Sequence, residues 1–367
     1  MNEKEGMFMN VLILTGRFGM GHYNAAMAVE EEILSRNPNA CVNIVDIIDY
    51  IFPTSSKLIY GNFNFLVRRC SFIYNFFNNI AGQFSDVPLK KTVAKSISRL
   101  LEEYKADLII ATLPVCSQYI SAFKEMTNSE IPLYTYITDL TIHEEWIAKN
   151  TDLYFVGSEG TKDNLISKGI AAEKIIVSGI PVKKSFKDVT EISEKSKNDK
   201  SEVLIMGGGL GLIPSNEDFL SKLCSNDNIH ITMITGKNQK LLRDMKERFP
   251  SIDVIGYTTE VHHYMKNADI IITKSGGITT FEAINIGTPL YILKPFLMQE
   301  VGNAEYIEQE NIGRIMWSNK SDVAKDVLAL LNNPLLLKSM RLNMKQIKEK
   351  WSTSCALSYY HKRGEVA

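Results

Sequence analysis

The sequence has no paired cysteines and no long apolar run. Its cysteines stand singly along 367 residues, at Cys41, Cys70, Cys116, Cys224 and Cys355. Because their number is odd and no C-x-x-C pair occurs, they argue against a disulfide framework or a zinc knuckle. No run of about 18 apolar residues could span a bilayer, and the N-terminus has no apolar signal region of useful length. We therefore expect a reduced, cytoplasmic protein.

An excess of charge of one sign is also missing. The 41 Lys and Arg residues nearly cancel the 42 Asp and Glu residues, so the net charge does not indicate a nucleic-acid partner. Any charged partner must therefore be recognised by a local patch. A hydrophobic content of 45% with 23% charged residues is typical of a soluble globular protein. A length of 367 residues suggests two domains.

Short apolar runs alternate with amphipathic stretches along the whole chain. The runs begin at Val11, Val42, Asp107, Leu133, Asp152, Ile175, Val203, Ile229, Ile252, Asp269, Pro289 and Gly313. Continuous apolar runs bounded by Gly or Asp indicate parallel strands that are covered on both faces. Six runs in each half predict two doubly wound α/β units in tandem.

Composition suggests the domain boundaries. Residues 183–202 contain 11 charged residues and no strand pattern, which is typical of a solvated linker. We therefore expect an N-terminal domain over 1–182 and a C-terminal domain over 203–335. The remaining residues, 336–367, have a long helical pattern and could form a C-terminal helix that packs back on the N-terminal domain.

One aromatic and basic region interrupts the alternation. Residues 50–84 hold ten aromatic side chains, and residues 57–99 hold seven basic residues against the single acid Asp86. One interpretation is a helical insertion whose aromatic side chains fill the core of the first domain. The other is an interfacial surface, with aromatic rings in the headgroup layer and basic residues on anionic lipid. The periodicity of one sequence does not separate the two.

Two glycine-rich turns follow strands in the second half. The first is G-G-G-L-G at residues 207–211, and the second is K-S-G-G at residues 274–277. Such turns let backbone N–H groups approach a phosphate, and the N-terminus of the following helix adds partial positive charge. They also serve simple tight packing. Two of them in one domain favour a nucleotide diphosphate as ligand.

Polar side chains follow the second turn. Glu282 lies about one and a half turns into the helix, where its carboxylate could accept both ribose hydroxyls of a nucleotide. Gln299, Glu300 and Asn303 could present amide and carboxylate groups to sugar hydroxyls. The alternatives are a solvent-facing glutamate for Glu282 and an ordinary acidic first turn of a helix for residues 299–303.

A histidine lies where the first strand hands over to a helix. Residues 15–26 read T-G-R-F-G-M-G-H-Y-N-A-A, directly behind the apolar run 11–14. An imidazole here could accept a proton near neutral pH, and a helix N-terminus would lower its pKa. His22 is therefore a candidate general base. The alternative for His22 is a helix-terminal residue that only binds backbone.

The order of these motifs resembles a known family. The motifs G-x-G-H, G-G-G-x-G, G-G-x-T-x-x-E-A and Q-E-x-x-N together resemble a two-domain glycosyltransferase of the GT-B type. More closely, they resemble the monogalactosyldiacylglycerol synthase / processive diacylglycerol glucosyltransferase family. The likeness covers nearly the whole chain, including Y-I-T-D-L-T-I-H-E-E-W at 136–146. It implies two Rossmann-like doubly wound domains that face an interdomain cleft.

The resemblance implies residues for the donor, a UDP-sugar. The glycine turns would hold the diphosphate, Glu282 the ribose, and Gln299 and Glu300 the sugar hydroxyls. Gly256, Tyr257 and Val261 would border the uracil. The implied donor-binding set is Gly207, Gly208, Gly209, Gly236, Asn238, Gly256, Tyr257, Val261, Ser275, Gly276, Gly277, Thr279, Glu282, Gln299, Glu300 and Asn303.

The resemblance also implies an activity and an acceptor side. The enzyme would transfer glucose or galactose, with inversion, to diacylglycerol or a glycosyl-diacylglycerol at the cytoplasmic face of the membrane, as a peripheral protein. His22 and Asp139 would be the catalytic residues: either could be the general base, or Asp139 could orient His22. The implied acceptor and membrane residues are Gly19, Gly21, His143, Trp146, Arg68, Arg69, Lys90 and Lys91. No D-x-D motif occurs in the sequence, so we expect no metal and no cofactor.

The sequence departs from the family in one loop. The family's P-x-P-G-Q-E is here P-F-L-M-Q-E at 295–300, which leaves the donor hexose open. Three other enzyme readings keep the fold: an undecaprenyl-linked acceptor, a soluble natural-product acceptor, or a UDP-N-acetylglucosamine 2-epimerase. A catalytically silent lipid- or nucleotide-binding protein is the non-enzyme alternative.

Overall fold

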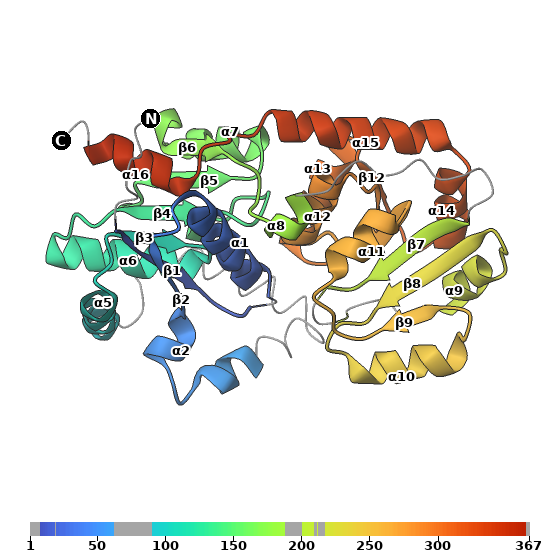
Figure 1. Cartoon of the computed structure of the whole chain (residues 1–367), viewed down its shortest axis with the longest axis horizontal. Coiled ribbons are helices and arrows are strands. Elements are labelled where there is room, and N and C mark those ends of the chain that lie inside the picture. The colour runs from blue at the N-terminus through green and yellow to red at the C-terminus, as the bar shows by residue number, and fades with distance from the viewer. Residues whose placement is uncertain are drawn as a thin grey trace. The chain divides into compact units, whose positions relative to one another are not determined.

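The computed structural model describes residues 8–18, 20–61, 90–187, 200–208, 211 and 217–364. The chain divides into two compact units. The first comprises residues 1–184 and 351–367, and the second comprises residues 185–350. Each unit has a parallel sheet with helices on both faces (Figure 1).

The first unit has a six-stranded sheet in the order β2-β1-β3-β4-β5-β6. Its strands are β1 (Asn10–Thr15), β2 (Cys41–Asp46), β3 (Leu108–Ala111), β4 (Leu133–Tyr136), β5 (Leu153–Val156) and β6 (Ile175–Val177). Its helices are α1 (Gly21–Arg36), α2 (Ile47–Ile51), α5 (Lys90–Tyr104), α6 (Pro114–Thr127), η1 (Glu144–Trp146), α7 (Glu159–Ser167), η2 (Ala172–Lys174) and α16 (Ala356–Gly364).

The continuous apolar run of β1 follows from burial on both faces of the sheet. Leu12 and Leu14 belong to a core that also holds residues of α5 and α6. Val11 and Ile13 belong to the opposite core, under α1 and the start of α16. Because successive side chains of a strand point to opposite faces, both alternating sets must be apolar.

The second unit has a six-stranded sheet in the order β12-β11-β10-β7-β8-β9. Its strands are β7 (Ser201–Met206), β8 (Ile229–Ile234), β9 (Asp253–Ile255), β10 (Ile270–Thr273), β11 (Leu290–Ile292) and β12 (Gly313–Ile315). Its helices are α9 (Glu217–Cys224), α10 (Gln239–Arg248), α11 (Val261–Asn267), α12 (Gly277–Ile286), α13 (Met298–Gln309), α14 (Val323–Leu331) and α15 (Pro334–Glu349). A short helix, α8 (Lys184–Lys187), crosses the boundary between the units. All twelve predicted strands are confirmed, as is the α/β class.

Each sheet has one point where the strand order reverses. In the first unit this switch point lies between β1 and β3, and in the second it lies between β7 and β10. Open parallel sheets bind ligands outside the carboxyl ends of the strands at such points. A ligand is therefore expected at the carboxyl ends of these four strands.

Two sequence predictions about the chain's connections need correction. The predicted linker over 183–202 contains helical residues 184–187 and the start of β7 at Ser201. The helix predicted over 336–367 is two helices, α15 and α16, which Figure 1 shows separately. Between them the Ser352 amide donates to the Val177 carbonyl oxygen over 2.7 Å, at the end of β6. Because this amide is hydrogen-bonded to a residue outside the helix, the chain around Ser352 is not helical.

The region predicted to be either core or membrane surface is described only in part. Tyr50 and Tyr60 pack against the core of the first unit, while residues 62–89 lie outside the described residues. In the described part of the chain, no helix has both the length and the apolar character needed to cross a membrane.

Candidate active site

His22 is the second residue of α1, just past the carboxyl end of β1. Its Nδ1 lies 2.9 Å from the carbonyl oxygen of Thr112 and 2.9 Å from the hydroxyl oxygen of Thr138. Because a carbonyl oxygen can only accept, Nδ1 carries the proton and donates it to Thr112. The lone pair of the neutral ring is therefore on Nε2, the nitrogen that can act as a base.

Asp139 and Trp146 lie beside this histidine. The indole Nε1–H of Trp146 donates to Oδ2 of Asp139 over 3.2 Å, and the Trp146 side chain is fully buried. The ring centroids of His22 and Trp146 are 6.1 Å apart. The fold thus brings His22 next to two predicted site residues, Asp139 and Trp146, that lie far later in the sequence.

Opposing effects act on the pKa of His22. Burial disfavours the imidazolium and is the largest effect, whereas the negative charge of Asp139 and the hydrogen bond to Thr112 favour it. The net result is a pKa of His22 below the usual histidine value of about 6.5. At neutral pH the ring is therefore uncharged and able to accept a proton.

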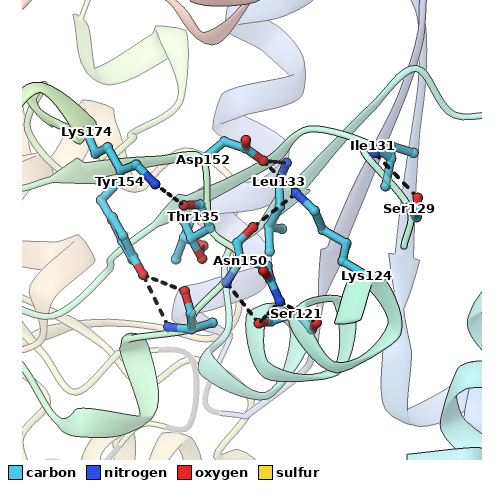
Figure 2. Close-up of polar contacts among 12 residues, drawn as sticks. Ser121, Lys124, Ser129, Ile131, Leu133, Thr135, Asn150, Asp152, Tyr154 and Lys174 are labelled. Carbon is cyan, nitrogen blue, oxygen red and sulfur yellow. Dashed lines mark hydrogen bonds and ion pairs between the residues drawn. The ribbon is translucent and has the colours of Figure 1, made fainter. Parts of the chain in front are cut away.

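Polar contacts hold the segment that carries Trp146. Gln118 on α6 donates to two backbone carbonyls on either side of Trp146, over 2.8 and 3.0 Å. Farther along, the Asn150 amide donates to the Ser121 carbonyl oxygen over 2.9 Å, and the Tyr154 hydroxyl donates to a backbone carbonyl over 3.0 Å (Figure 2). These contacts anchor the backbone of the segment whose indole donates to Asp139.

Sequence reasoning missed a network that supports the turn before His22. The Tyr60 hydroxyl lies 2.6 Å from an Asp46 carboxylate oxygen and accepts the Arg17 backbone N–H over 3.1 Å. The Arg17 guanidinium pairs with Asp46 at 2.9 Å and also with Asp49. Arg17 follows β1, and Asp46 is the last residue of the neighbouring parallel strand β2, so their approach could have been predicted. Tyr60 lies in a separate helical segment, and no sequence motif indicated that its hydroxyl would contact Asp46.

The first glycine turn of the second unit is tied to the end of β8. Gly208 and Gly211 have positive φ angles of 68° and 61°. A Cβ at Gly211 would lie 2.1 Å from the Thr235 carbonyl oxygen, so only glycine fits there. Asn238 caps α10 and donates from Nδ2 to the Gly211 carbonyl oxygen over 3.4 Å. With Gly236 at a φ of 57°, these predicted donor residues form one connected pair of turns.

The second glycine turn is held by the Q-E-x-x-N segment. The Ser275 hydroxyl donates to the Glu300 carbonyl oxygen over 2.6 Å, and Asn303 Nδ2 donates to the Ser275 carbonyl oxygen over 2.9 Å. The Lys274 ammonium lies 2.9 Å from Glu300 Oε1. Ser275, Glu300 and Asn303 are all buried. The structure thus brings the two motifs together and directs Glu300 and Asn303 at the turn.

The other predicted donor residues lie along the same sheet edge. Gly276 caps α12, Gly277 begins it, and the half-buried Thr279 and Glu282 follow within its first turns. Gln299 is a half-buried residue in the first turn of α13. Because all six strands are parallel, their carboxyl ends meet at this edge.

The predicted uracil border follows β9. Gly256 and Tyr257 come directly after that strand, and Val261 begins α11. The Tyr257 ring is 59% exposed, and the Lys237 ammonium lies over it, 5.5 Å from the ring centroid. Lys237 was not among the predicted site residues, although it lies between two of them.

Several predicted residues lie outside the described residues. They are Gly19, Arg68, Arg69 and Gly209. Lys90 and Lys91 begin α5, and only their backbone is described. Gly207 and Gly21 directly follow β7 and begin α1, respectively.

His143 is a separate feature of the first unit. It precedes η1, and its Nε2 is buried without a hydrogen-bond partner among the described residues. Burial raises the pKa of Glu145 above its usual value, and the nearby His143 opposes that shift. The described residues contain no group of three His, Cys, Asp or Glu side chains suited to hold a metal ion.

Solved structures share this two-unit architecture. MurG of Acinetobacter baumannii aligns with a TM-score of 0.62 at 14% identity, over 96% of this chain and 98% of its own. A Staphylococcus aureus MnaA–UDP structure aligns with a TM-score of 0.58 at 14% identity, over 90% of each chain. The chain has the GT-B fold, as predicted.

Sequence comparison gives the family. Residues 22–182 match the family described as "Monogalactosyldiacylglycerol (MGDG) synthase". Residues 202–353 match the family described as "Glycosyltransferase family 28 C-terminal domain". A processive diacylglycerol β-glucosyltransferase of Bacillus cereus (strain B4264) is 28% identical over 92% of this chain and 89% of its own length. One of Staphylococcus epidermidis (strain ATCC 12228 / FDA PCI 1200) is 28% identical over 94% and 90%. These matches confirm the family resemblance predicted from the motifs, and the chain is a hexosyltransferase.

Proposed function

We propose that this enzyme transfers a hexose, glucose or galactose, from a UDP-sugar to diacylglycerol or a glycosyl-diacylglycerol, with inversion. The relatives named as processive diacylglycerol β-glucosyltransferases support the acceptor class. The observation that carries the chemistry is the 2.9 Å contact between His22 Nδ1 and the Thr112 carbonyl oxygen, which leaves Nε2 as the nitrogen that can accept a proton.

The reaction is a direct displacement. The acceptor hydroxyl oxygen forms a bond to the anomeric carbon while the bond from that carbon to the UDP oxygen breaks. The proton of the hydroxyl passes to Nε2 of His22, and UDP leaves with the bonding electron pair. A base of depressed pKa suits this step, because it is unprotonated at neutral pH. Asp139 would stabilise the imidazolium that forms.

The two glycine turns of the second unit would bind the donor. They follow β7 and β10, the strands on either side of the switch point. Backbone N–H groups and the N-terminus of α12 would stabilise the charge that develops on the leaving diphosphate. Glu282 would bind the ribose. We propose no metal and no cofactor for this chemistry.

The acceptor is a lipid, so we propose that the enzyme works as a peripheral protein on the cytoplasmic face of the membrane. Arg68, Arg69, Lys90 and Lys91 would meet anionic headgroups. Neutralising these four residues should reduce binding to anionic vesicles at physiological salt. Full retention of vesicle binding would remove them from the proposal.

The fold itself leaves a second enzyme reading open. A UDP-N-acetylglucosamine 2-epimerase of Listeria monocytogenes, named as putative, also aligns, with a TM-score of 0.56 at 14% identity over 92% of this chain and 91% of its own. The match of residues 22–182 to the MGDG synthase family favours the lipid acceptor over epimerisation.

Product analysis by mass spectrometry tests the proposal. Purified protein is incubated with diacylglycerol vesicles and, separately, UDP-glucose, UDP-galactose and UDP-N-acetylglucosamine. We expect a hexosyl-diacylglycerol from one hexose donor, its loss in His22→Ala, and its retention in His263→Ala, which changes an exposed histidine of α11. Conversion of UDP-N-acetylglucosamine without any acceptor would instead identify an epimerase.

A further inference from the structure

A buried carboxylate pairs with the lysine that opens the second glycine turn. Glu300 is 2% exposed, and its Oε1 lies 2.9 Å from the Lys274 ammonium. Its Oε2 lies 3.4 Å from the Phe296 backbone nitrogen. Both carboxylate oxygens therefore face the protein. A carboxylate in this position is poorly placed to read a sugar hydroxyl.

Lys274, the first residue of the second glycine turn, lies beside the first glycine turn. It directly follows β10, whose last residue, Thr273, pairs with Met206 at the end of β7. A Cβ placed on Gly208 would lie 3.8 Å from Cε of Lys274, so the lysine side chain reaches the turn of the neighbouring strand. Its side chain remains 33% exposed. The ammonium has three N–H donors, and the pair with Glu300 uses one of them.

The surrounding hydrogen bonds fix this lysine in place. Ser275 and Asn303, both almost fully buried, connect the turn to the start of α13 in both directions. A lysine normally holds its long side chain loosely, because its four torsions are free. Here the backbone of the turn and the end of the side chain are both held by the same helix.

We propose that Lys274 is the side chain that binds the diphosphate of the donor, and that Glu300 is a positioning residue that aims it. The positive end of the pair is partly open, whereas the negative end is buried. A lysine binds phosphate as a point charge. During displacement the same charge stabilises the departing UDP. This inference rests on the proposed function, because it requires a nucleotide-sugar donor.

The test compares ligands that differ only in phosphate and sugar. Binding of uridine, UMP, UDP and UDP-glucose to the full-length protein is measured by calorimetry or competition. For Lys274→Met we expect UDP affinity to fall by about 10- to 100-fold, the range of one charge-assisted hydrogen bond. Uridine affinity should stay within about twofold of wild type. Lys274→Arg, which keeps the charge, should recover part of the loss.

Glu300→Gln separates the two roles of the carboxylate. If Glu300 positions Lys274, UDP and UDP-glucose lose affinity by the same factor, and uridine does not. If Glu300 reads the sugar, UDP-glucose alone loses affinity, which would overturn the positioning role.

Lys274→Met leaves a buried carboxylate unpaired, which can unfold a protein. The double variant Lys274→Met/Glu300→Gln removes both charges and keeps the shapes, so it provides a folded comparison. Lys222→Met is the matched control, because Lys222 of α9 pairs with Asp218 of the same helix and with Asp322, which caps α14, outside the two turns. We expect the double variant to lose UDP affinity and the control to keep it.

Unchanged preference for UDP over uridine in the folded double variant would overturn the assignment of Lys274. A wild-type protein that binds none of the four ligands would instead overturn the proposed function, and this inference with it. The two failures are therefore distinguishable.

Discussion

The two units build different sites on the same type of sheet. In the first unit, the carboxyl edge holds an imidazole whose Nδ1 is bound by Thr112 and Thr138 and whose pKa is lowered by burial. In the second unit, the same edge holds glycine turns of positive φ and a buried Lys–Glu pair. One arrangement favours a neutral base, and the other presents backbone donors and a cation. The switch point of a parallel sheet determines only where a ligand can bind. The residues at the strand ends determine the chemistry of the site.

The largest expected effect comes from the first unit. His22→Ala should lower kcat by about 10²- to 10⁴-fold, the usual contribution of a general base. UDP affinity should change little, because the donor turns belong to the second unit. Steady-state kinetics and UDP titration check both. A loss of UDP affinity equal to the loss of kcat would contradict the division of roles between the units.

The next effect concerns the second unit. Glu282→Ala should weaken UDP binding by about 10-fold, the value of a hydrogen bond to a charged group. Binding of a uridine diphosphate that lacks both ribose hydroxyls should not respond to the substitution. Calorimetry with the two ligands measures this. An equal loss for both ligands would remove the ribose assignment, and a matched melting temperature would show that the fold is intact.

A smaller effect should follow from Tyr60→Phe. The substitution removes the hydroxyl that joins Asp46 to the Arg17 backbone, while the ion pair between Arg17 and Asp46 remains. We expect a loss of about 1 kcal/mol in the free energy of unfolding. If this network positions the turn before His22, kcat should also fall while UDP affinity stays constant. Denaturant titration measures the free energy of unfolding, and steady-state kinetics measure kcat. A kcat equal to that of the wild type would limit Tyr60 to a stabilising role.

The smallest expected effect concerns His230, whose pKa is shifted in the opposite direction to that of His22. The hydrogen bond to Glu202 is the largest cause that raises the pKa of His230, which also contacts Asp253. Its stabilisation is therefore present below pH of about 6.5 and is lost as pH rises through its raised folded-state pKa. The lowered pKa of His22 has the opposite consequence, because its contribution is lost as pH falls through the folded-state value.

His230→Gln should therefore destabilise the protein more at pH 5.5 than at pH 8.5. The difference should be no more than about 1 kcal/mol, because the His230 side chain is 37% exposed and solvent screens the pair. Thermal melts of wild type and variant at the two pH values measure it. A loss of stability in His230→Gln that is larger at pH 8.5 than at pH 5.5 would contradict the raised pKa of His230.

The sequence determined the twelve strands, the two doubly wound units and the family motifs. It could do so because strands covered on both faces carry mostly apolar side chains in both alternating sets, and because sharp strand-to-helix turns require glycine at Gly208 and Gly211. These are local constraints, which act on the residues that carry them.

Only the tertiary structure decided which side chains act on one another. Glu300 looked in sequence like a residue that reads sugar, yet folding buries it against Lys274, which precedes it by 26 positions. Thr112 and Tyr60 gave no chemical signal in sequence, yet one sets the tautomer of His22 and the other supports the preceding turn. Partners like these are chosen by strand order and helix packing, which depend on contacts between residues far apart in the chain.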